Sequence, residues 1–423
     1  MGIVTHRTDM NCDVLVVGAG PAGAVAAGLL ARQGWSVRVL EKHAVPRGKL
    51  CGDLIGPRTL SVLKSLDLLD LAVEARGRVV DEIRIFDERR LVGWGSLSRD
   101  GGGAGFGHGL ALERAALDAS LRDRACLAGA ELLQGVRFTR IESQDETGIR
   151  STALSDRGEI RFRSRLILGA DGVHSSVARQ IGLSRRNPAK MILGVRCYYA
   201  GVPDPSGALE LYFDRALFPG YGWLIPLGEG RANVGVGIRA DVCARRGRSV
   251  RSLFHRFVET HPDLSRRLAR ARRLGKVEGW PIGLYGQALK NYGSHVLLLG
   301  DAGNFVDPLS GEGVYGAVES ARLAAATSEE ALRAGRFDAE FLSRYEARWR
   351  SRFEEDFGLA DRLVSLPYHI RSLSSLALWA IRRMCRRGIR SSAYANKVTG
   401  FFSGTIPRKA ALRVDFILET LLG

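Results

Sequence analysis

The chain has 423 residues, 45% of them hydrophobic, so it is long and apolar enough for two globular domains and is not a disordered protein. Its formal net charge of +17 requires that nucleic acid be considered as a partner, but the positive residues are mostly arginines spread along the chain, and no nucleic-acid-binding motif accompanies them. Six scattered cysteines without a CxxC pair argue against disulfides and zinc, and no apolar run reaches the ~18 residues of a membrane span. We therefore expect a cytoplasmic globular protein without a metal or a nucleic-acid partner, whose charge fits an anionic membrane surface or a phosphorylated substrate.

The first predicted elements are a strand, a glycine-rich loop, a helix and a second strand. Residues 14–17 form a short apolar strand, 24–33 a helix that begins with small residues, and 36–40 the next strand, which Glu41 closes. A G-x-G-x-x-G loop in this setting lets a pyrophosphate lie against bare backbone at a helix N-terminus, and an acid about 20 residues further on binds a ribose hydroxyl. The unit predicts a dinucleotide site formed by Gly18, Gly20, Ala22, Gly23, Glu41 and Lys42.

Helices and strands continue through the first half of the chain. Apolar residues at helical spacing predict an amphipathic helix over 57–71, and strands follow over 79–94. The glycine tract 101–107 predicts a loop, 112–125 a helix, and 160–168 another strand.

Residues 191–238 predict a meander of antiparallel strands. In its last strand, 231–238, apolar residues alternate with Asn233, Gly235 and Gly237. We expect this segment to form the sheet of a substrate domain, with a glycine-lined face that a ligand can approach closely.

A second G-x-G-x-x-G, at residues 311–316, has a different setting. Asp307 and a proline precede it, so no strand leads into it, and the strand lies further back, at 296–299, before Asp301. A helix that begins near Gly311 still offers unpaired N–H groups and the positive end of its dipole. We therefore expect it to face an electron-rich group other than the pyrophosphate of the first loop.

After residue 324 the chain is predicted to be mostly helical. Four aromatic residues recur at every fourth position and predict a helix face packed on the core: Phe341, Tyr345, Trp349 and Phe353. Residues 372–390 combine leucines, Trp379 and Ile381 with five arginines. A basic apolar helix of this kind either lies on a membrane surface or is a solvated helix end, and the sequence leaves both interpretations open.

Two motifs resemble those of FAD-dependent oxidoreductases with the p-hydroxybenzoate hydroxylase fold. GDAGNFVDPLSGEGVYGAVES, from Gly300, resembles their second FAD fingerprint, and GADGVHSSVAR, from Gly169, resembles their D-G motif. The resemblance implies that the first glycine loop holds the ADP half of FAD, that Asp301 binds a ribityl hydroxyl, and that the helix after Gly311 points at the pyrimidine edge of the flavin. It adds these residues to the expected cofactor site: Arg47, Arg114, Asp171, Asp301, Gly311, Glu312 and Gly313.

The resemblance implies an α/β fold with a Rossmann-like FAD-binding domain, an interleaved antiparallel-sheet substrate domain and a helical C-terminal region. The expected FAD-binding domain comprises residues 1–76, 108–183 and 291–330, the substrate domain 77–107 and 184–290, and the helical region 331–423. The sequence holds no second strand-fed fingerprint for NAD(P)H. NAD(P)H is therefore expected to bind transiently as reductant, or electrons to arrive from an external donor.

Three stretches resemble the geranylgeranyl reductase family. PRGKLCGD (Pro46–Asp53) resembles its P-R-x-K-x-C-G-G signature with Asp53 in place of the second glycine, and YGWLIP (Tyr221–Pro226) resembles its Y-x-W-x-F-P with Ile225 in place of the aromatic residue. VTGFFSGTIPRKAAL near the end resembles its tail. The resemblance implies reduction of isoprenoid C=C bonds on a prenyl lipid, a quinone or a terpenoid.

Other members of the fold stay open as alternatives. Aromatic hydroxylases and terpenoid epoxidases share the FAD motifs, so a monooxygenase acting on a lipophilic metabolite is the main alternative. YGWLIP also comes close to the G-W-x-W-x-I-P of flavin halogenases. Prenyl-binding escort proteins resemble the fold but perform no redox chemistry.

Cys51 is the candidate catalytic residue. Arg47, Lys49 and Arg58 are near it in sequence and would lower its pKa. It could donate or relay the proton that C=C reduction needs beside a hydride, or it could be a small packed thiol.

The candidate substrate-binding residues are Tyr221, Trp223 and Gly235. Tyr221 and Trp223 are two apart and so share a face of their strand. They line a channel for an apolar chain or pack between sheets.

Overall fold

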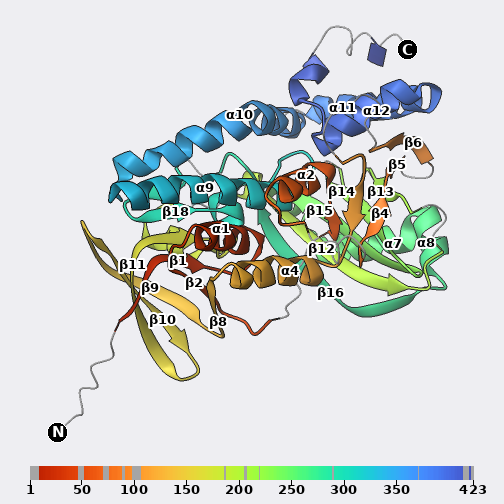
Figure 1. Cartoon of the computed structure of the whole chain (residues 1–423). Helices are drawn as coiled ribbons and strands as arrows, with labels where there is room; N and C mark the ends of the chain where they lie inside the picture. Colours follow the sequence, from red (N-terminus) through yellow and green to blue (C-terminus); the bar gives the residue numbers. More distant parts are fainter. Residues whose placement is uncertain are drawn as a thin grey trace.

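The computed structural model describes residues 9–45, 52–69, 76–87, 91–97, 106–184, 187–203, 207–218, 220–287, 290–369, 371–412 and 419–420. Two large β-sheets lie side by side in this part of the chain, and long helices cover the first sheet and continue past the second (Figure 1). The mixed α/β class predicted from the sequence is confirmed.

The first sheet has eight strands around a parallel centre. β1 (Met10–Val17) lies between β2 (Val37–Glu41) and β11 (Gly158–Gly169) and is parallel to both. Parallel pairing continues on one side to β8 (Glu131–Gln134) and on the other to β18 (Val296–Leu298). Antiparallel strands extend it: β17 (Tyr292–Gly293) on β18, β10 (Gly148–Ser155) on β11, and β9 (Arg137–Asp145) on β10.

Both faces of the first sheet are buried, as an apolar run in a parallel strand predicts. Val14 and Val16 of β1 face one core, and Leu15 and Val17 face another on the opposite side. The first core is covered by α1 (Pro21–Arg32), which packs against α4 (Arg114–Leu127) and α9 (Val314–Ala334). The helix predicted to begin at residue 24 thus begins at Pro21, because proline suits the first turn of a helix.

The second sheet has seven strands in the order β16, β12, β15, β14, β13, β5, β6. Their bounds are β5 Glu82–Phe86, β6 Leu91–Ser96, β12 Met191–Ala200, β13 Leu209–Tyr212, β14 Tyr221–Gly228, β15 Arg231–Arg239 and β16 Arg272–Gly283. The predicted meander is confirmed for β13, β14 and β15, whereas β12 pairs with β15 and β16, and β13 pairs in parallel with β5. The domain boundaries given above stay a prediction, supported by the strands of the two large sheets falling on opposite sides of them.

Smaller elements connect and cover the two sheets. A three-stranded sheet joins β3 (Leu54–Ile55), β7 (Gly109–Ala111) and β4 (Arg78–Val80). Short helices are α5 Ser176–Gln180, α6 Ala240–Arg245, α7 Val250–Thr260 and α8 Pro262–Leu268, with 3-10 turns at Pro188–Lys190, Gly300–Gly303 and Arg408–Leu412. The helix predicted over 57–71 is shorter: α2 (Pro57–Ser65) ends where Asp67 takes a left-handed φ of 54°. Most of the predicted glycine loop, 101–107, lies outside the described residues.

The end of the chain is helical, as predicted. α10 (Ala339–His369) buries Phe341, Tyr345, Trp349 and Phe353 in the first core, so their packed-face interpretation is confirmed. α11 (Arg371–Arg390) packs on β6 and on α12 (Ser392–Ser403) at one end of the molecule (Figure 1). Among the described residues, no helix combines the length and the hydropathy needed to cross a membrane.

Candidate functional site

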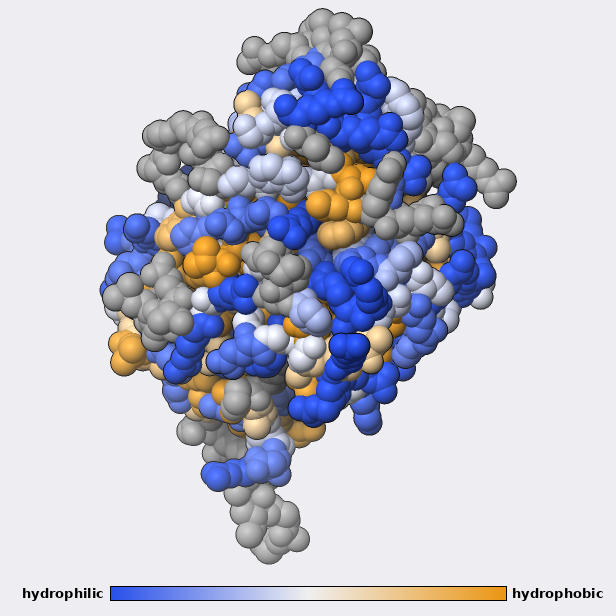
Figure 2. Space-filling view, turned by 90° about the vertical axis from the view of Figure 1, so that its right-hand side faces the viewer, coloured by the Kyte–Doolittle hydropathy of each residue, from blue (hydrophilic) through white to orange (hydrophobic). Residues whose placement is uncertain are grey.

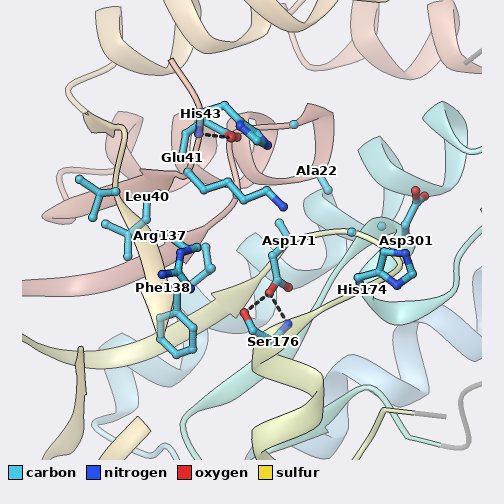
Figure 3. Close-up of a pocket in the computed structure, with 18 of the residues that line it drawn as sticks. Ala22, Leu40, Glu41, His43, Arg137, Phe138, Asp171, His174, Ser176 and Asp301 are labelled. Carbon is cyan, nitrogen blue, oxygen red and sulfur yellow. Dashed lines mark hydrogen bonds between the residues drawn. The ribbon is translucent and has the colours of Figure 1, made fainter. Parts of the chain in front are cut away.

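A cavity of about 730 Å³ lies at the carboxyl ends of β1, β2 and β11 (Figure 3). Open parallel sheets bind their ligands at this edge, where strand ends and helix N-termini meet. Seven of the predicted cofactor residues line the cavity: Gly18, Gly20, Ala22, Glu41, Lys42, Asp171 and Asp301. Figure 3 shows Glu41 and Asp171 on opposite sides of the cavity and Asp301 toward one end.

The glycine loop forms one wall of the cavity. Gly18 has a φ of 104°, and a Cβ on it would lie 2.5 Å from the Ala170 carbonyl oxygen, so only glycine fits between β1 and β11. Gly20 borders open space, since a Cβ there would meet nothing within 4 Å. It precedes α1, whose N-terminus has no side-chain cap. The first N–H groups of α1 therefore point at the cavity as an anion site.

Gly23 has a different role from the other loop glycines. It does not line the cavity, and a Cβ on it would lie 1.9 Å from the Gly18 carbonyl oxygen. It therefore allows α1 to pack closely against the loop.

Glu41 ends β2 with its side chain buried beside the glycine loop. Its Oε2 accepts a hydrogen bond from the Ala19 amide at 3.2 Å and its Oε1 one from the His43 amide at 3.1 Å. These bonds orient the Glu41 carboxylate, which lines the cavity and is the kind of group that binds a ribose hydroxyl.

Asp171 follows β11 and lies opposite Glu41. Its Oδ2 accepts hydrogen bonds from the Ser176 amide at 2.6 Å and the Ser176 hydroxyl at 2.7 Å, which tie it to the start of α5. Its Oδ1 is buried without a hydrogen-bond partner. Buried polar atoms are nearly always satisfied, so this oxygen fits a hydroxyl or N–H group of a ligand in the cavity.

Asp301 links the cavity to the second glycine loop. It lies in the 3-10 turn after β18 and lines the cavity, and a Cβ on Gly313 would be 3.5 Å from its Oδ1. Neither Gly311 nor Gly313 lines the cavity, and Gly313 adjoins it through Asp301. Gly311 has a φ of 71°, which glycine adopts without strain, and α9 begins at Val314.

Glu312 turns away from the cavity. Its Oε1 accepts a hydrogen bond from the Thr59 hydroxyl at 2.6 Å, and a Cβ on Gly56 would lie 3.0 Å from the same oxygen. Burial raises the pKa of Glu312 above its ordinary value, although Arg58 acts in the opposite direction. The side chain thus joins the second loop to the start of α2, and its predicted contact with the cofactor would have to come from its backbone.

One candidate substrate residue of the second sheet, Tyr221, contacts the second glycine loop. The Tyr221 hydroxyl donates to the Ser310 carbonyl at 2.5 Å. The Trp223 ring lies across Gly235, where a Cβ would be 2.2 Å from Cζ2. The glycine face is therefore not open at Gly235, because the indole occupies the space that the missing side chain provides.

Arg114 was also predicted for the cofactor site, but it does not line the cavity. Its guanidinium donates to Asp118 Oδ1 at 2.9 Å. Arg47 and Cys51 lie outside the described residues.

The sequence did not single out several residues that line the cavity. Residues 136–139 at the start of β9 form one wall, and His43 adjoins Glu41. His174 and Trp280 also line it, with ring centroids 5.5 Å apart. The sequence offered a signal for the β9 residues, because they follow β8, the outermost parallel strand on that side of the sheet, and so lie at its carboxyl edge. It offered no signal that Trp280 would line the cavity.

The donor set of the cavity fits FAD and does not resemble a metal site. Open helix N–H groups suit a pyrophosphate, while Glu41, Asp171 and Asp301 offer carboxylate oxygens to ribose and ribityl hydroxyls along the cavity. In the described part of the chain, no group of three or more His, Cys, Asp or Glu residues is placed to hold a metal ion.

Comparison with known proteins agrees with this assignment. A family model described as an FAD binding domain matches residues 11–355. Digeranylgeranylglycerophospholipid reductase 2 of Methanothermobacter thermautotrophicus is 33% identical over 352 residues, covering 81% of this chain and 84% of that protein. Menaquinone reductase of Mycobacterium tuberculosis is 31% identical over 399 residues, covering 92% of each chain.

Solved structures share the fold. A geranylgeranyl bacteriochlorophyll reductase-like protein from Thermoplasma acidophilum matches with a TM-score of 0.74 and 22% identity, over 98% of this chain and 96% of that one. The p-nitrophenol 4-monooxygenase PnpA of Pseudomonas putida matches with a TM-score of 0.72 and 18% identity, over 92% and 97%. Fold and site thus define an FAD-dependent oxidoreductase. Within that class, the chain belongs to the geranylgeranyl reductase family.

Proposed function

We propose that the protein reduces isoprenoid C=C bonds of a lipophilic substrate, a prenyl lipid, a quinone or a terpenoid. The reductase relatives support this, as does one contact: Tyr221 of the second sheet bonds to Ser310 in the loop that adjoins Asp301. An apolar chain lying along Tyr221 and Trp223 would therefore be next to the flavin end of the cofactor cavity. The reductant is proposed to be NAD(P)H, bound transiently, or an external electron donor.

FAD, when bound and reduced, supplies a hydride. The amides of the first glycine loop and of α1 would hold its pyrophosphate, and Glu41 its ribose. Asp171 and Asp301 would hold hydroxyls nearer the flavin. Tyr221 and Trp223 would exclude water from the alkene, and the Cys51 thiol would give its proton to the carbon that does not receive the hydride.

A membrane surface is proposed as the place where the substrate is met. Trp379 of α11 is 47% exposed and has the Arg383 guanidinium 5.6 Å from its ring centre, while Arg386 and Arg390 are exposed. Aromatic and basic side chains together favour an anionic lipid surface. On the face drawn in Figure 2, hydrophilic side chains gather toward the upper end, at the height of α11 and α12, with an apolar patch below them.

The experiment that tests the reaction separates a reductase from a monooxygenase. Chemically reduced protein is incubated without oxygen with prenylated candidates, and the products are weighed by mass spectrometry. We expect a gain of about two mass units per reduced bond, since a hydride and a proton are added. Products heavier by one oxygen, formed only in air, would refute the reductase and support the monooxygenase.

Cys51→Ser tests the proton donor in the same assay. We expect this variant to lose most of the reduction while keeping its flavin. Cys126→Ser is the matched control, because Cys126 is an exposed thiol on α4. Equal activity in the two variants would overturn the role of Cys51 but not the reduction itself.

A further inference from the structure

We propose that Asp53 is a positioning residue, which fixes the Trp223 indole through Asn233 and so shapes the wall against which the substrate lies. That the substrate lies against this wall rests on the proposed function. The chain of hydrogen bonds from Asp53 to Trp223 is present in the protein whatever its substrate.

The chain of hydrogen bonds joins Asp53 to two side chains of the second sheet, Asn233 and Trp223, which come much later in the sequence. Trp223 Nε1 donates to Asn233 Oδ1 at 3.0 Å, and Asn233 Nδ2 donates to Asp53 Oδ2 at 2.7 Å. The other carboxylate oxygen, Oδ1, accepts from the Arg114 amide at 3.0 Å. Asp53 and Asn233 are both fully buried, so water does not offer them alternative partners.

The two outer groups of this chain of hydrogen bonds fix the direction of every bond in it. An indole can only donate, and the Arg114 amide can only donate. Asn233 must therefore turn its oxygen to Trp223 and its nitrogen to Asp53, and residue 53 must accept at both oxygens. Tyr198 adds a third hydrogen bond to the same carboxyl. Burial raises the pKa of Asp53, but these hydrogen bonds act against it and favour the ionised acceptor.

Trp223 is the member of this chain of hydrogen bonds that forms part of the proposed substrate wall. Its ring lies over Gly235 and close to Gly237, where a Cβ would be 3.6 Å from Cζ3. The Tyr221 ring is 6.2 Å away, centre to centre. An indole held at Nε1 cannot rotate off the glycines, so the wall keeps one shape between Tyr221 and Asn233.

The segment of Asp53 lies on the same face of the sheet. A Cβ on Gly52 would be 3.3 Å from Ile225 Cδ1, and Ile225 is the register partner of Asn233 in β14 and β15. The segment that follows Cys51 is thus attached to the wall by apolar contact at Gly52 and by hydrogen bond at Asp53.

The test exchanges the hydrogen-bond donor and acceptor between positions 53 and 233. Asp53→Asn places a donor opposite either the Arg114 amide or Asn233 Nδ2, whichever way its amide turns. The double variant Asp53→Asn/Asn233→Asp restores the three bonds described above: the new amide at position 53 accepts from the Arg114 amide and donates to the new carboxylate at position 233, which also accepts from Trp223. The control is Asp118→Asn, which removes another buried carboxylate beside Arg114.

The first measurement needs no substrate. The near-ultraviolet circular dichroism of Trp223 is isolated by subtracting the spectrum of Trp223→Phe, with all proteins in the same flavin-loaded state. We expect the Trp223 signal to be lost in Asp53→Asn, regained in the double variant and unchanged in Asp118→Asn. A signal that survives Asp53→Asn, or that the double variant does not regain, would overturn the positioning role.

The second measurement is the Kd of geranylgeraniol for the oxidised, FAD-loaded protein, in which no turnover occurs. We expect Asp53→Asn to weaken binding about tenfold and the double variant to restore it. Equal Kd values for wild type and Asp53→Asn, with the dichroism changed, would refute the link between the indole and the wall. Wild-type protein that binds no prenyl probe would refute the proposed function instead, and the dichroism would still decide the role of Asp53.

Discussion

Replacing Arg408 by methionine is expected to destabilise the protein much more than the same change at its neighbour, Lys409. The Arg408 side chain is fully buried and forms an ion pair with Asp307, which is also fully buried. Asp356 accepts from the Arg408 amide at 3.0 Å. Lys409 forms an ion pair with Glu355 at 2.7 Å, but both side chains are about two-thirds exposed, 65% and 67%.

The expected magnitude follows from burial. Removing one partner of a buried ion pair costs ~3–5 kcal/mol, because the remaining charge stays buried, whereas exposed pairs contribute little. Methionine keeps most of the apolar stem of arginine, so the packing loss is small. An unfolding entropy of ~2 cal/mol/K per residue, taken over the whole chain, converts this cost to a fall of roughly 3–6 °C in the thermal midpoint.

The difference between wild type and Arg408→Met should depend on pH. Burial alone would raise the pKa of Asp307, but Arg408 and Arg58 outweigh it and hold the pKa below its ordinary value. A lowered pKa contributes stability that is present above the unfolded-state pKa and is lost as the pH falls through the folded-state pKa. The gap between the two midpoints should therefore be full near neutral pH and should narrow below about pH 4.

Differential scanning calorimetry of wild type, Arg408→Met and Lys409→Met provides the comparison. Adding Asp307→Asn to Arg408→Met should recover part of the loss, since it removes the buried carboxylate that is left with Arg58 as its ion-pair partner. Equal midpoints for the two methionine variants, or a gap that is independent of pH, would refute the reasoning.

Three further predictions concern the cofactor and the membrane. Asp301→Ala should lose FAD, measured by flavin absorbance per mole of purified protein, and full occupancy would exclude Asp301 as a ribityl ligand. Gly18→Ala should lose FAD and stability, because its Cβ would lie 2.5 Å from the Ala170 carbonyl oxygen; Gly129→Ala, at a φ of 105° against 104° but with no atom within 4 Å, separates this clash from backbone strain. Binding to anionic liposomes should weaken as salt rises over the physiological range, in which screening lengths are about 8–10 Å. It should also fall in Arg386→Gln/Arg390→Gln. Equal sedimentation of the protein with neutral and anionic liposomes would contradict a role for α11.

The sequence predicted those residues of the site whose position depends on the strand directly before them. Gly18, Asp171 and Asp301 follow strands of the first sheet and Glu41 ends one, and the carboxyl ends of parallel strands meet at one edge. A motif that places a residue after such a strand therefore also places it at the cavity.

The part that the sequence missed depends on contacts between distant segments. Glu312 was predicted to face the cofactor, yet its side chain bonds to Thr59, 253 positions earlier in the chain. Gly235 was expected to leave an open face, yet Trp223 from the neighbouring strand fills it. Alternation along a strand predicts which residues share a face, but not which neighbour covers them.

The two glycine loops differ in how they are held, and this difference links the remote parts of the chain to the cofactor. The first loop lies directly between a strand and a helix, and the neighbouring strand β2 holds it through the hydrogen bond from the Ala19 amide to Glu41. The second loop has no strand leading into it, and side chains from three segments hold it instead: Arg408 through Asp307, Thr59 through Glu312, and Tyr221 through Ser310. Because these contacts come from the C-terminal region, from α2 and from the second sheet, a change in any of them acts on the loop beside Asp301. A substrate that moves Tyr221 would therefore also move the backbone expected to face the flavin, whereas the pyrophosphate end would keep its geometry.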